Sequence, residues 1–213
     1  VIVKDVVNIN AYLIAGPNVM VDKASRPLNE QFEMTKGNQP TDGGHLLLTK
    51  DEVDGLGLNQ QQTRKIIRKI FGSAEFIRGL ERYCIWLNDQ DLVQLGQIPS
   101  ISGRLEAVKS MRLQSTKAAT IALACAPHKF GEIRQTGFEN LIVVPRVSSE
   151  GREYLPVGYE PKETIISDSA FGIFDAPLWN MALIASRLHL VWIGTVCGKM
   201  KTDFRYSNTL GWN

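Results

Sequence analysis

The sequence predicts an α+β fold with mixed helices, a largely antiparallel sheet and a helical C-terminal portion. The 213 residues, 44% of them hydrophobic, are enough to bury a sizeable core. Short runs of β-favouring residues alternate with turn-rich stretches, and the apolar spacing becomes helical toward the C-terminus. We therefore expect one domain over residues 1–177, with residues 178–213 as a helical segment packed on it.

The first quarter of the chain predicts short strands and ordered loops before the first helix. Residues 1–3 and 9–15 have the composition of strands, whereas Gly, Pro and Asn clusters predict irregular structure over residues 16–49. Thr49 is followed three positions later by Glu52, which is the spacing of a capping box. A helix is therefore expected to begin after Thr49.

Helices dominate the prediction for the middle of the chain. Residues 63–71 are expected to form a short helix, whose inner face is Ile66, Ile67 and Ile70. Residues 82–87 predict a buried strand and are followed by the expected helices 89–95, 99–113 and 118–124. In the longest helix, Leu105, Val108 and Leu113 are expected to face inward, and Arg104, Lys109 and Arg112 outward.

The last part of the chain predicts an antiparallel meander and then a helical segment. Residues 141–144 and 153–157 are expected strands, and residues 164–173 contain one or two more. Residues 178–200 are expected to be mostly helical. Their predicted apolar stripe is Leu183, Ile184, Leu188, Val191 and Trp192.

Positive charge is concentrated in the middle of the chain. Residues 60–152 carry 14 Lys/Arg against 8 Asp/Glu, a net charge of +6, whereas the whole chain carries only +2. Such a distribution suits a surface that faces phosphates, and equally a set of solvated helix faces. No apolar run is long enough for a membrane span, and no signal peptide is recognisable. Three cysteines in apolar contexts predict buried thiols and a cytoplasmic location.

Motifs for catalysis are absent from the sequence. There is no Walker loop, no Pro-Pro dipeptide of the kind found in adenine methyltransferases and no cysteine pair at metal spacing. The three histidines are far apart and are expected to be structural or surface residues. Glu160-Pro-Lys162 imitates a nuclease motif, but proline is unfavourable on the core strand which that motif requires. We therefore expect no catalytic residue, cofactor or metal in this chain.

Several segments together resemble the target-recognition domain of MmeI-like (type IIL) enzymes, which fuse an adenine-N6 methyltransferase to a restriction endonuclease. They are NINAYL (8–13), GNQPTDGG (37–44) with residues 46–48, RYCIWL (82–87), FGEIRQ (130–135), VPRVSSE (144–150) with YLPVG (154–158), SDSA (167–170), HLVW (189–192) and KTDFRYS (201–207). The chain opens without a methionine, and the methyltransferase domain would precede it. We therefore expect a fragment of a longer bacterial protein.

The resemblance implies two places that read DNA bases. One matches Lys117 and Ala118, and the other matches Glu150, Arg152 and Tyr154. Arg can donate two hydrogen bonds to guanine and Glu can accept one from cytosine. Residues at spacing two share one face of a strand, so the second group is expected to point one way. An ordinary exposed hairpin is the alternative for that group.

A further set of residues is expected to contact DNA phosphates or to brace the loops. These are Lys109, Arg134, Arg146, Ser148, Ser149, Lys201 and Arg205. The partners implied by the resemblance are double-stranded DNA and a methyltransferase domain of the same polypeptide, which would bind S-adenosylmethionine. Two rival hypotheses are a metal-dependent nuclease that uses Glu160, Lys162 and Asp168, and a protein-interaction module.

Overall fold

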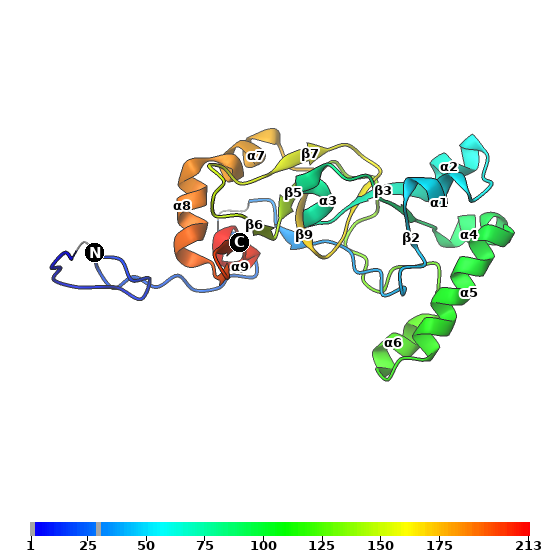
Figure 1. Ribbon diagram of the computed structural model, residues 1–213, viewed down its shortest axis with the longest axis horizontal. Coiled ribbons are helices and arrows are strands. Elements are labelled where there is room, and N and C mark those ends of the chain that lie inside the picture. The colour runs from blue at the N-terminus through cyan, green and yellow to red at the C-terminus, as the bar shows by residue number, and fades with distance from the viewer. Residues whose placement is uncertain (1–2, 29–30) are drawn as a thin grey trace.

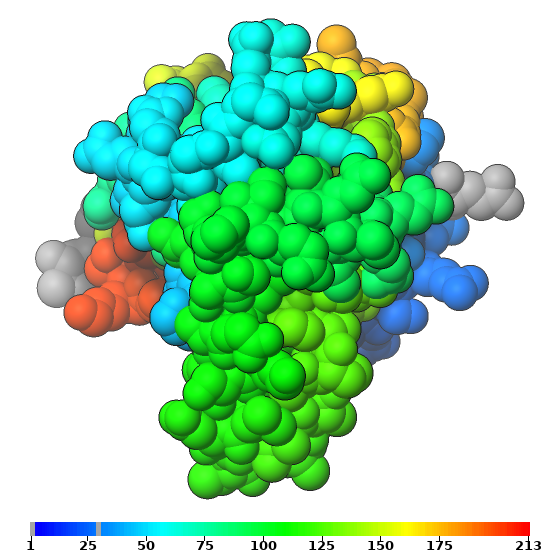
Figure 2. All heavy atoms as spheres, turned by 90° about the vertical axis from the view of Figure 1, so that its right-hand side faces the viewer, coloured from blue at the N-terminus to red at the C-terminus, as the bar shows by residue number. Residues whose placement is uncertain are grey.

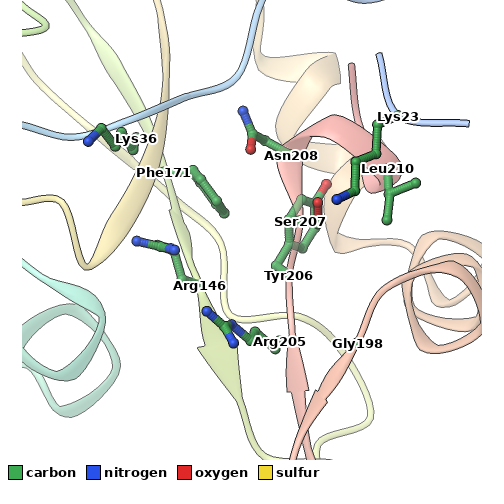
Figure 3. A pocket seen from close by; sticks show the side chains of 10 residues that line it. All are labelled: Lys23, Lys36, Arg146, Phe171, Gly198, Arg205, Tyr206, Ser207, Asn208 and Leu210. Atoms are coloured by element: carbon green, nitrogen blue, oxygen red, sulfur yellow. The ribbon is translucent and has the colours of Figure 1, made fainter. Parts of the chain in front are cut away.

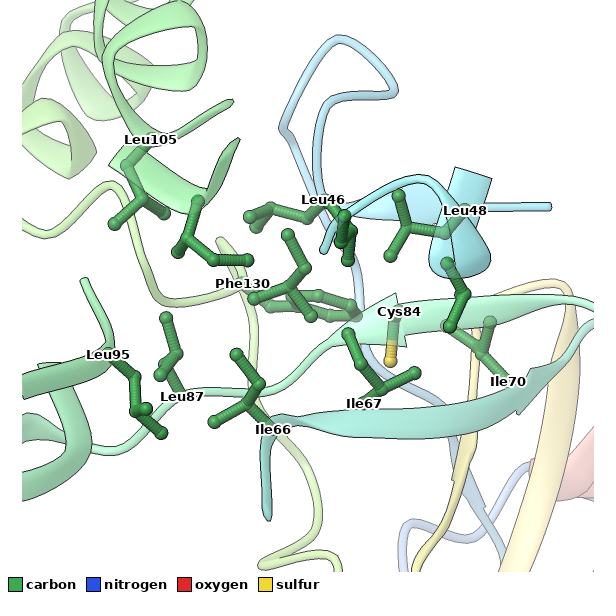
Figure 4. Packing of buried hydrophobic residues seen from close by; sticks show 14 of the residues in the cluster. Leu46, Leu48, Ile66, Ile67, Ile70, Cys84, Leu87, Leu95, Leu105 and Phe130 are labelled. Atoms are coloured by element: carbon green, nitrogen blue, oxygen red, sulfur yellow. The ribbon is translucent and has the colours of Figure 1, made fainter. Parts of the chain in front are cut away.

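Two hydrophobic cores lie along the long axis of the molecule (Figure 1). The computed structural model describes residues 3–28 and 31–213. The first core is built around Leu46, Ile85 and Leu105, as Figure 4 shows in part. The second contains Ile142 and Ile193 and lies nearer the two ends of the chain. Each core is enclosed by its own sheet and helices.

A four-stranded antiparallel sheet lies at the centre of the molecule. Its strands, in order across the sheet, are β1 (Thr35–Lys36), β9 (Ala170–Phe174), β5 (Leu141–Pro145) and β7 (Gly158–Glu160). Alternate residues of β5 enter different clusters: Ile142 belongs to the second core, whereas Leu141 and Val143 pack on the other face. This strand is therefore buried on both faces, as its unbroken apolar sequence requires.

A second sheet supports the first core, and a small third sheet lies beside the second core. The second sheet has the order β2 (Leu47–Leu48), β4 (Tyr83–Ile85), β3 (Ile67–Phe71) and β8 (Thr164–Ile166), with β3 and β8 parallel. The third has the order β10 (Lys199–Met200), β11 (Asp203–Arg205) and β6 (Val147–Ser148), all antiparallel. The fold is therefore α+β with largely antiparallel sheets, as predicted.

The helices fall into two groups, one around each core. Around the first core are α1 (Lys50–Asp54), α2 (Gln60–Ile66), α4 (Asp89–Leu95), α5 (Pro99–Leu113), α6 (Ala118–Ala122) and the 3-10 helix η1 (Leu123–Cys125). Helix α3 (Ser73–Arg78) packs against β5. Around the second core are α7 (Leu178–Ala185), α8 (Arg187–Val196) and α9 (Asn208–Gly211). Residues 178–213 therefore contain two short strands besides their helices.

Most predicted elements are confirmed, several of them at their predicted ends. Thr49 caps α1, and the reciprocal hydrogen bonds of the capping box with Glu52 are both present. Helices α4, α5 and α6 and strands β4, β5, β8 and β9 lie within or close to their predicted ranges. The meander is confirmed in part, because β8 leaves the central sheet to pair with β3.

The predicted helix over residues 63–71 is wrong in its second half. Helix α2 ends at Ile66, and the chain continues directly as β3. Ile67 and Ile70 carry β-branched side chains, which are favoured in strands, and β3 is inserted between β4 and β8. Tertiary pairing thus decides a segment whose local spacing also fits a helix.

Two predicted strands are also corrected, and a third lies largely outside the described residues. Residues 9–15 form a tight turn closed by a bridge between Ile9 and Ala15, and Leu13 has a φ of 59°. Residues 153–157 form no strand, because the partner of β5 is the later segment β7. The strand predicted at residues 1–3 falls largely on residues 1–2, which lie outside the described residues, and residue 3 is not in a strand.

Arg112 is buried, which contradicts the prediction that it faces solvent. Its exposed fraction is 0%, whereas Leu113, predicted to face inward, is 54% exposed. The guanidinium group makes five hydrogen bonds of 2.7–3.2 Å to carbonyl oxygens, those of Pro40, Thr41, Leu123, Ala126 and Lys129. Two loops close over the end of α5 and supply these acceptors, and burial lowers the pKa of Arg112.

The apolar stripe predicted for the C-terminal helices is largely exposed to solvent. Of its five residues only Ile184 is buried, whereas Leu188 is 78% and Val191 66% exposed. The helix is interrupted at Ser186, which caps α8 with its hydroxyl group, and the interruption turns a different face of α8 to the core. That face carries His189, Ile193 and Val196.

Most of the cysteines and histidines are buried. Cys84 and Cys197 are buried, but Cys125 is exposed, which corrects the prediction for that residue. His128 lies 2.8 Å from a carboxylate oxygen of Asp89, and His189 lies 2.7 Å from the hydroxyl oxygen of Tyr206. Within the part of the chain that the structure describes, no helix is long and apolar enough to cross a membrane.

His189 is expected to make the stability of the second core depend on pH. Burial lowers the pKa of His189 to about 4 from an ordinary value of 6.5. Between these values the unfolded chain takes up a proton that the folded chain does not, so stability falls as the pH falls. We expect His189 to lower the free energy of unfolding by about 3 kcal/mol across this window. Urea denaturation of the wild type and of His189→Gln tests this, because the variant should lack that part of the pH dependence. Equal pH dependence in both would contradict it.

Candidate nucleic-acid interface

A helical arm carries the first place that was predicted to read bases. Helices α5 and α6 project from the rest of the molecule (Figures 1 and 2). Lys117 is the N-cap residue of α6 and Ala118 its first residue, and both side chains are exposed near the end of the arm. Lys109 is exposed on α5. The arm thus presents two lysines to solvent, and the structure describes no ion pair for either.

Arg112 ties the C-terminal end of α5 to the segments around it. Its hydrogen bonds join α5 to η1 and to the loop that follows η1, which together form the return path of the chain from the arm. They also join α5 to Pro40 and Thr41 of the turn-rich N-terminal part. The buried guanidinium group of Arg112 therefore holds the segment that begins at Lys117 against the end of α5.

The second predicted place is a turn, and the reasoning from a strand is wrong. Glu150, Arg152 and Tyr154 are all exposed, but residues 149–157 form no strand, so a spacing of two does not place them on one face. The backbone N–H of Arg152 donates to the carbonyl oxygen of Ser149 at 3.2 Å. Glu150 forms an ion pair with Lys199 at 3.3 Å. Its orientation is thus set by β10 rather than by a strand of its own.

The small third sheet brings this turn close to predicted phosphate-binding residues. Strand β6 precedes the turn and pairs with β11, so that Arg205 lies opposite Val147. Lys201 occupies the hairpin between β10 and β11 and is exposed. Glu150, Lys201 and Arg205 therefore belong to one sheet and its loops. Lys117 and Ala118 lie elsewhere, at the α6 end of the molecule (Figure 1).

A basic cavity of about 540 Å³ lies beside this sheet (Figure 3). Its lining residues are Lys23, Lys36, Arg146, Phe171, Gly198, Arg205, Tyr206, Ser207, Asn208 and Leu210. Two of the predicted phosphate contacts, Arg146 and Arg205, lie on the same side of it in Figure 3. Lys23 and Lys36 were not associated with them from the sequence, because both lysines come from distant segments and belong to no recognisable motif.

Other predicted phosphate contacts differ in accessibility. Ser148 is buried, and its hydroxyl group has no hydrogen-bond partner, which contradicts a role in binding phosphate at the surface. Ser149 is exposed and its hydroxyl oxygen accepts a hydrogen bond from Gly151. Arg134 is exposed but pairs with Glu132 at 3.0 Å, and its backbone N–H donates to Asn38. These contacts favour the bracing role for Arg134.

Glu132 links Arg134 to the basic cavity. It pairs with Lys36 as well as with Arg134, both at 3.0 Å. The two cations, Lys36 first, lower the pKa of the Glu132 carboxyl group below its ordinary value. Lys36 is therefore held in place by a carboxylate outside the lining of the cavity.

The residues of the rival nuclease hypothesis do not gather at a metal site. Glu160 and Lys162 line a cavity that does not include Asp168. The carbonyl oxygen of Asp168 instead accepts a hydrogen bond from Arg146. Among the described residues, no group of three His, Cys, Asp or Glu side chains is placed to hold a metal ion.

Comparison with known proteins identifies similar sequences and structures. Residues 15–213 match the family model described as "MmeI, target recognition domain". DNA methyltransferase A of Bacillus subtilis (strain 168) is 38% identical over 210 residues, which are 99% of this chain and 24% of that protein. The structure of the type IIL restriction–modification enzyme MmeI in complex with DNA is similar with a TM-score of 0.87 and 32% identity. That match covers 98% of this chain and 28% of the other. The chain thus spans about a quarter of the length of these relatives.

Proposed function

This chain belongs to the family of MmeI target recognition domains, and from that membership we propose that it reads the sequence of double-stranded DNA for a DNA methyltransferase or restriction–modification enzyme. One observation carries the proposal beyond family membership. The turn that holds Glu150 and Arg152, the cations Lys201 and Arg205, and the basic cavity all lie on or beside one small sheet. Base-reading and phosphate-binding groups need this proximity, because phosphate contacts set the register in which bases are read.

The proposed roles of the exposed residues follow from their chemistry. Arg152 and Glu150 would read base edges, with Tyr154 beside them, and Lys117 and Ala118 would contact bases from the arm. Lys109, Arg146, Lys201 and Arg205 would contact phosphates. The two base-reading places are separated in the molecule, so we propose that they read different parts of one asymmetric site.

We propose that catalysis belongs to another domain of the same polypeptide, an adenine-N6 methyltransferase that binds S-adenosylmethionine and flips the target base. Cleavage of DNA by the full-length protein would identify an accompanying endonuclease domain. The exposed apolar side chains of α7 and α8 support a neighbouring domain, because such patches mark interaction surfaces. Absence of methylated adenine in cells that express the full-length protein would contradict this assignment.

Binding of the chain to duplex DNA tests the proposed function, and we expect the affinity to fall steeply with salt. The net charge of +6 over residues 60–152 motivates this prediction. If the chain contacts about three to five phosphates, the slope of log affinity against log salt should be roughly −3 to −4.5. Fluorescence anisotropy with a labelled duplex measures it. A slope near zero, or binding to protein partners alone, would favour the rival interaction module.

A further inference from the structure

The basic cavity beside the small sheet is assembled from four separate parts of the chain. Lys23 comes from the segment that precedes β1 and Lys36 from β1 itself, whereas Arg146 lies between β5 and β6 and Arg205 lies on β11. In Figure 3 these four side chains surround a space that also borders Phe171 and Tyr206. These four cations are far apart in the sequence and come together only in the folded chain. The positive charge of the cavity therefore does not arise from a local run of basic residues.

The charges of this cavity are poorly neutralised within the chain. Lys36 pairs with Glu132, but the structure describes no ion pair for Lys23, Arg146 or Arg205. None of the residues that line the cavity is acidic. Cations in a concave site repel one another and create a positive potential there. A bound anion would reduce this repulsion.

Arg146 is held in position before any ligand binds, and the chain next to Arg205 is joined to it by a backbone hydrogen bond. Arg146 donates one hydrogen bond from Nη1 to the carbonyl oxygen of Asp168 at 2.8 Å, and its guanidinium group lies over the ring of Phe171 at 5.2 Å. The carbonyl oxygen of Arg146 accepts from the backbone N–H of Tyr206, which follows Arg205. A guanidinium group has five N–H donors, so most of those on Arg146 stay available. Such pre-organisation favours bidentate binding of a phosphate group.

The segment that contains Lys23 is attached at the other side of the cavity. The backbone N–H of Ala24 donates to the carbonyl oxygen of Thr209 at 2.9 Å, and this bond keeps Lys23 beside α9. Asn208 donates from its side chain to the carbonyl oxygen of Met34, close to β1. The cavity therefore joins the N-terminal part of the chain to its C-terminal hairpin.

We propose that this cavity binds one backbone phosphate of the target duplex, as an anchor that fixes the register of the neighbouring base-reading turn. The inference rests on the proposed function. The position of the cavity favours duplex DNA over a free anion, because Arg205 pairs with the strand that leads into the turn of Glu150 and Arg152. A phosphate held there would position the adjacent bases against that turn.

The variants Arg205→Gln and Lys23→Gln test the anchor. Each is expected to weaken duplex binding about 10-fold at low salt, since a charge-assisted contact is lost. Each should also make the salt slope shallower by about 0.9. Lys23 is exposed, so its variant should fold even if Arg205→Gln does not. The matched control is Arg78→Gln, which removes the same charge from the exposed C-terminal end of α3, where the structure describes no ion pair, and should leave the slope unchanged.

Methylphosphonate substitution identifies the phosphate itself. Neutral linkages are introduced one at a time along a duplex that the wild type binds. We expect one position at which the substitution weakens wild-type binding about 10-fold but barely changes the binding of the Arg205→Gln variant. The same pattern in the wild type and in Arg205→Gln would overturn the anchor. So would inorganic phosphate or adenosine monophosphate binding that depends on Arg205 and leaves duplex binding unaffected. Failure of the wild type to bind any duplex would instead contradict the proposed function.

Discussion

Replacing Arg112 by Met is expected to lower the free energy of unfolding by about 3–5 kcal/mol, among the largest effects of any single substitution in this chain. The guanidinium group is fully buried and donates to five carbonyl oxygens. Methionine fills much of the volume but donates to none of them, so several buried acceptors would lose their partners. Urea denaturation measures the loss. The variant Arg112→Lys should recover part of the stability, because an ammonium group has three donors in a different geometry.

Lys109→Met is the matched control for Arg112→Met. It removes a cation from the same helix at an exposed position, and it should change the free energy of unfolding by no more than about 0.5 kcal/mol. If Arg112→Met is equally mild, the hydrogen bonds of Arg112 do not hold the arm. The position of Lys117 would then need another explanation.

Exchanging the turn residues, Glu150→Lys with Arg152→Asp, is expected to change one position of the DNA motif that the full-length protein methylates and to leave the others intact. Each bidentate contact between a side chain and a base contributes about 1–3 kcal/mol of discrimination. The exchange removes the ion pair between Glu150 and Lys199, which constrains the turn, but both residues are exposed, so the fold should tolerate it. Sequencing of methylated adenines in cells that express the variant measures the motif.

The control for this exchange removes a proposed phosphate contact. Lys109→Gln should weaken methylation at all cognate sites without altering the motif, because phosphates carry no base identity. An unchanged motif in an active, folded Glu150→Lys/Arg152→Asp protein would contradict the placement of this turn against the bases. The turn would then be an ordinary exposed hairpin.

Local sequence signals predicted those parts of the fold that local interactions determine. The capping box at Thr49 and Glu52 is satisfied within one turn of helix, and Pro99 begins α5 where a proline is compatible with helix geometry. Strand β5 was recognisable because a run of five buried apolar residues suits a strand covered on both faces. The fold class followed from such elements.

Features that depend on distant segments escaped prediction. Residues 67–71 form a strand only because β4 and β8 flank them. Arg112 is buried because carbonyl oxygens from residues up to 72 positions away surround it. The apolar stripe of α7 and α8 was read as one helix facing the core, whereas Ser186 divides it and leaves Leu188 exposed.

More of the residues of the candidate site than of its geometry could be expected from the sequence. The resemblance implied that the turn of Glu150 and Arg152 reads bases, and Arg146 and Arg205 were expected to contact phosphates. The fold places these residues near one small sheet. Nothing in the sequence pointed to Lys23 or Lys36, which reach the cavity through the packing of the N-terminal part. The strand geometry inferred for the turn was wrong, since spacing alone does not determine whether a segment pairs.

Selection of duplexes from a library with a randomised central segment tests most directly the claim that this chain reads DNA sequence. The chain is incubated with the library at low salt, and bound and input duplexes are sequenced. We expect enrichment of one asymmetric motif, with each specified position favoured by about 1–3 kcal/mol over the alternatives. Retention of duplexes with the same base composition as the input would contradict it, because the chain would then bind the DNA backbone without reading its bases.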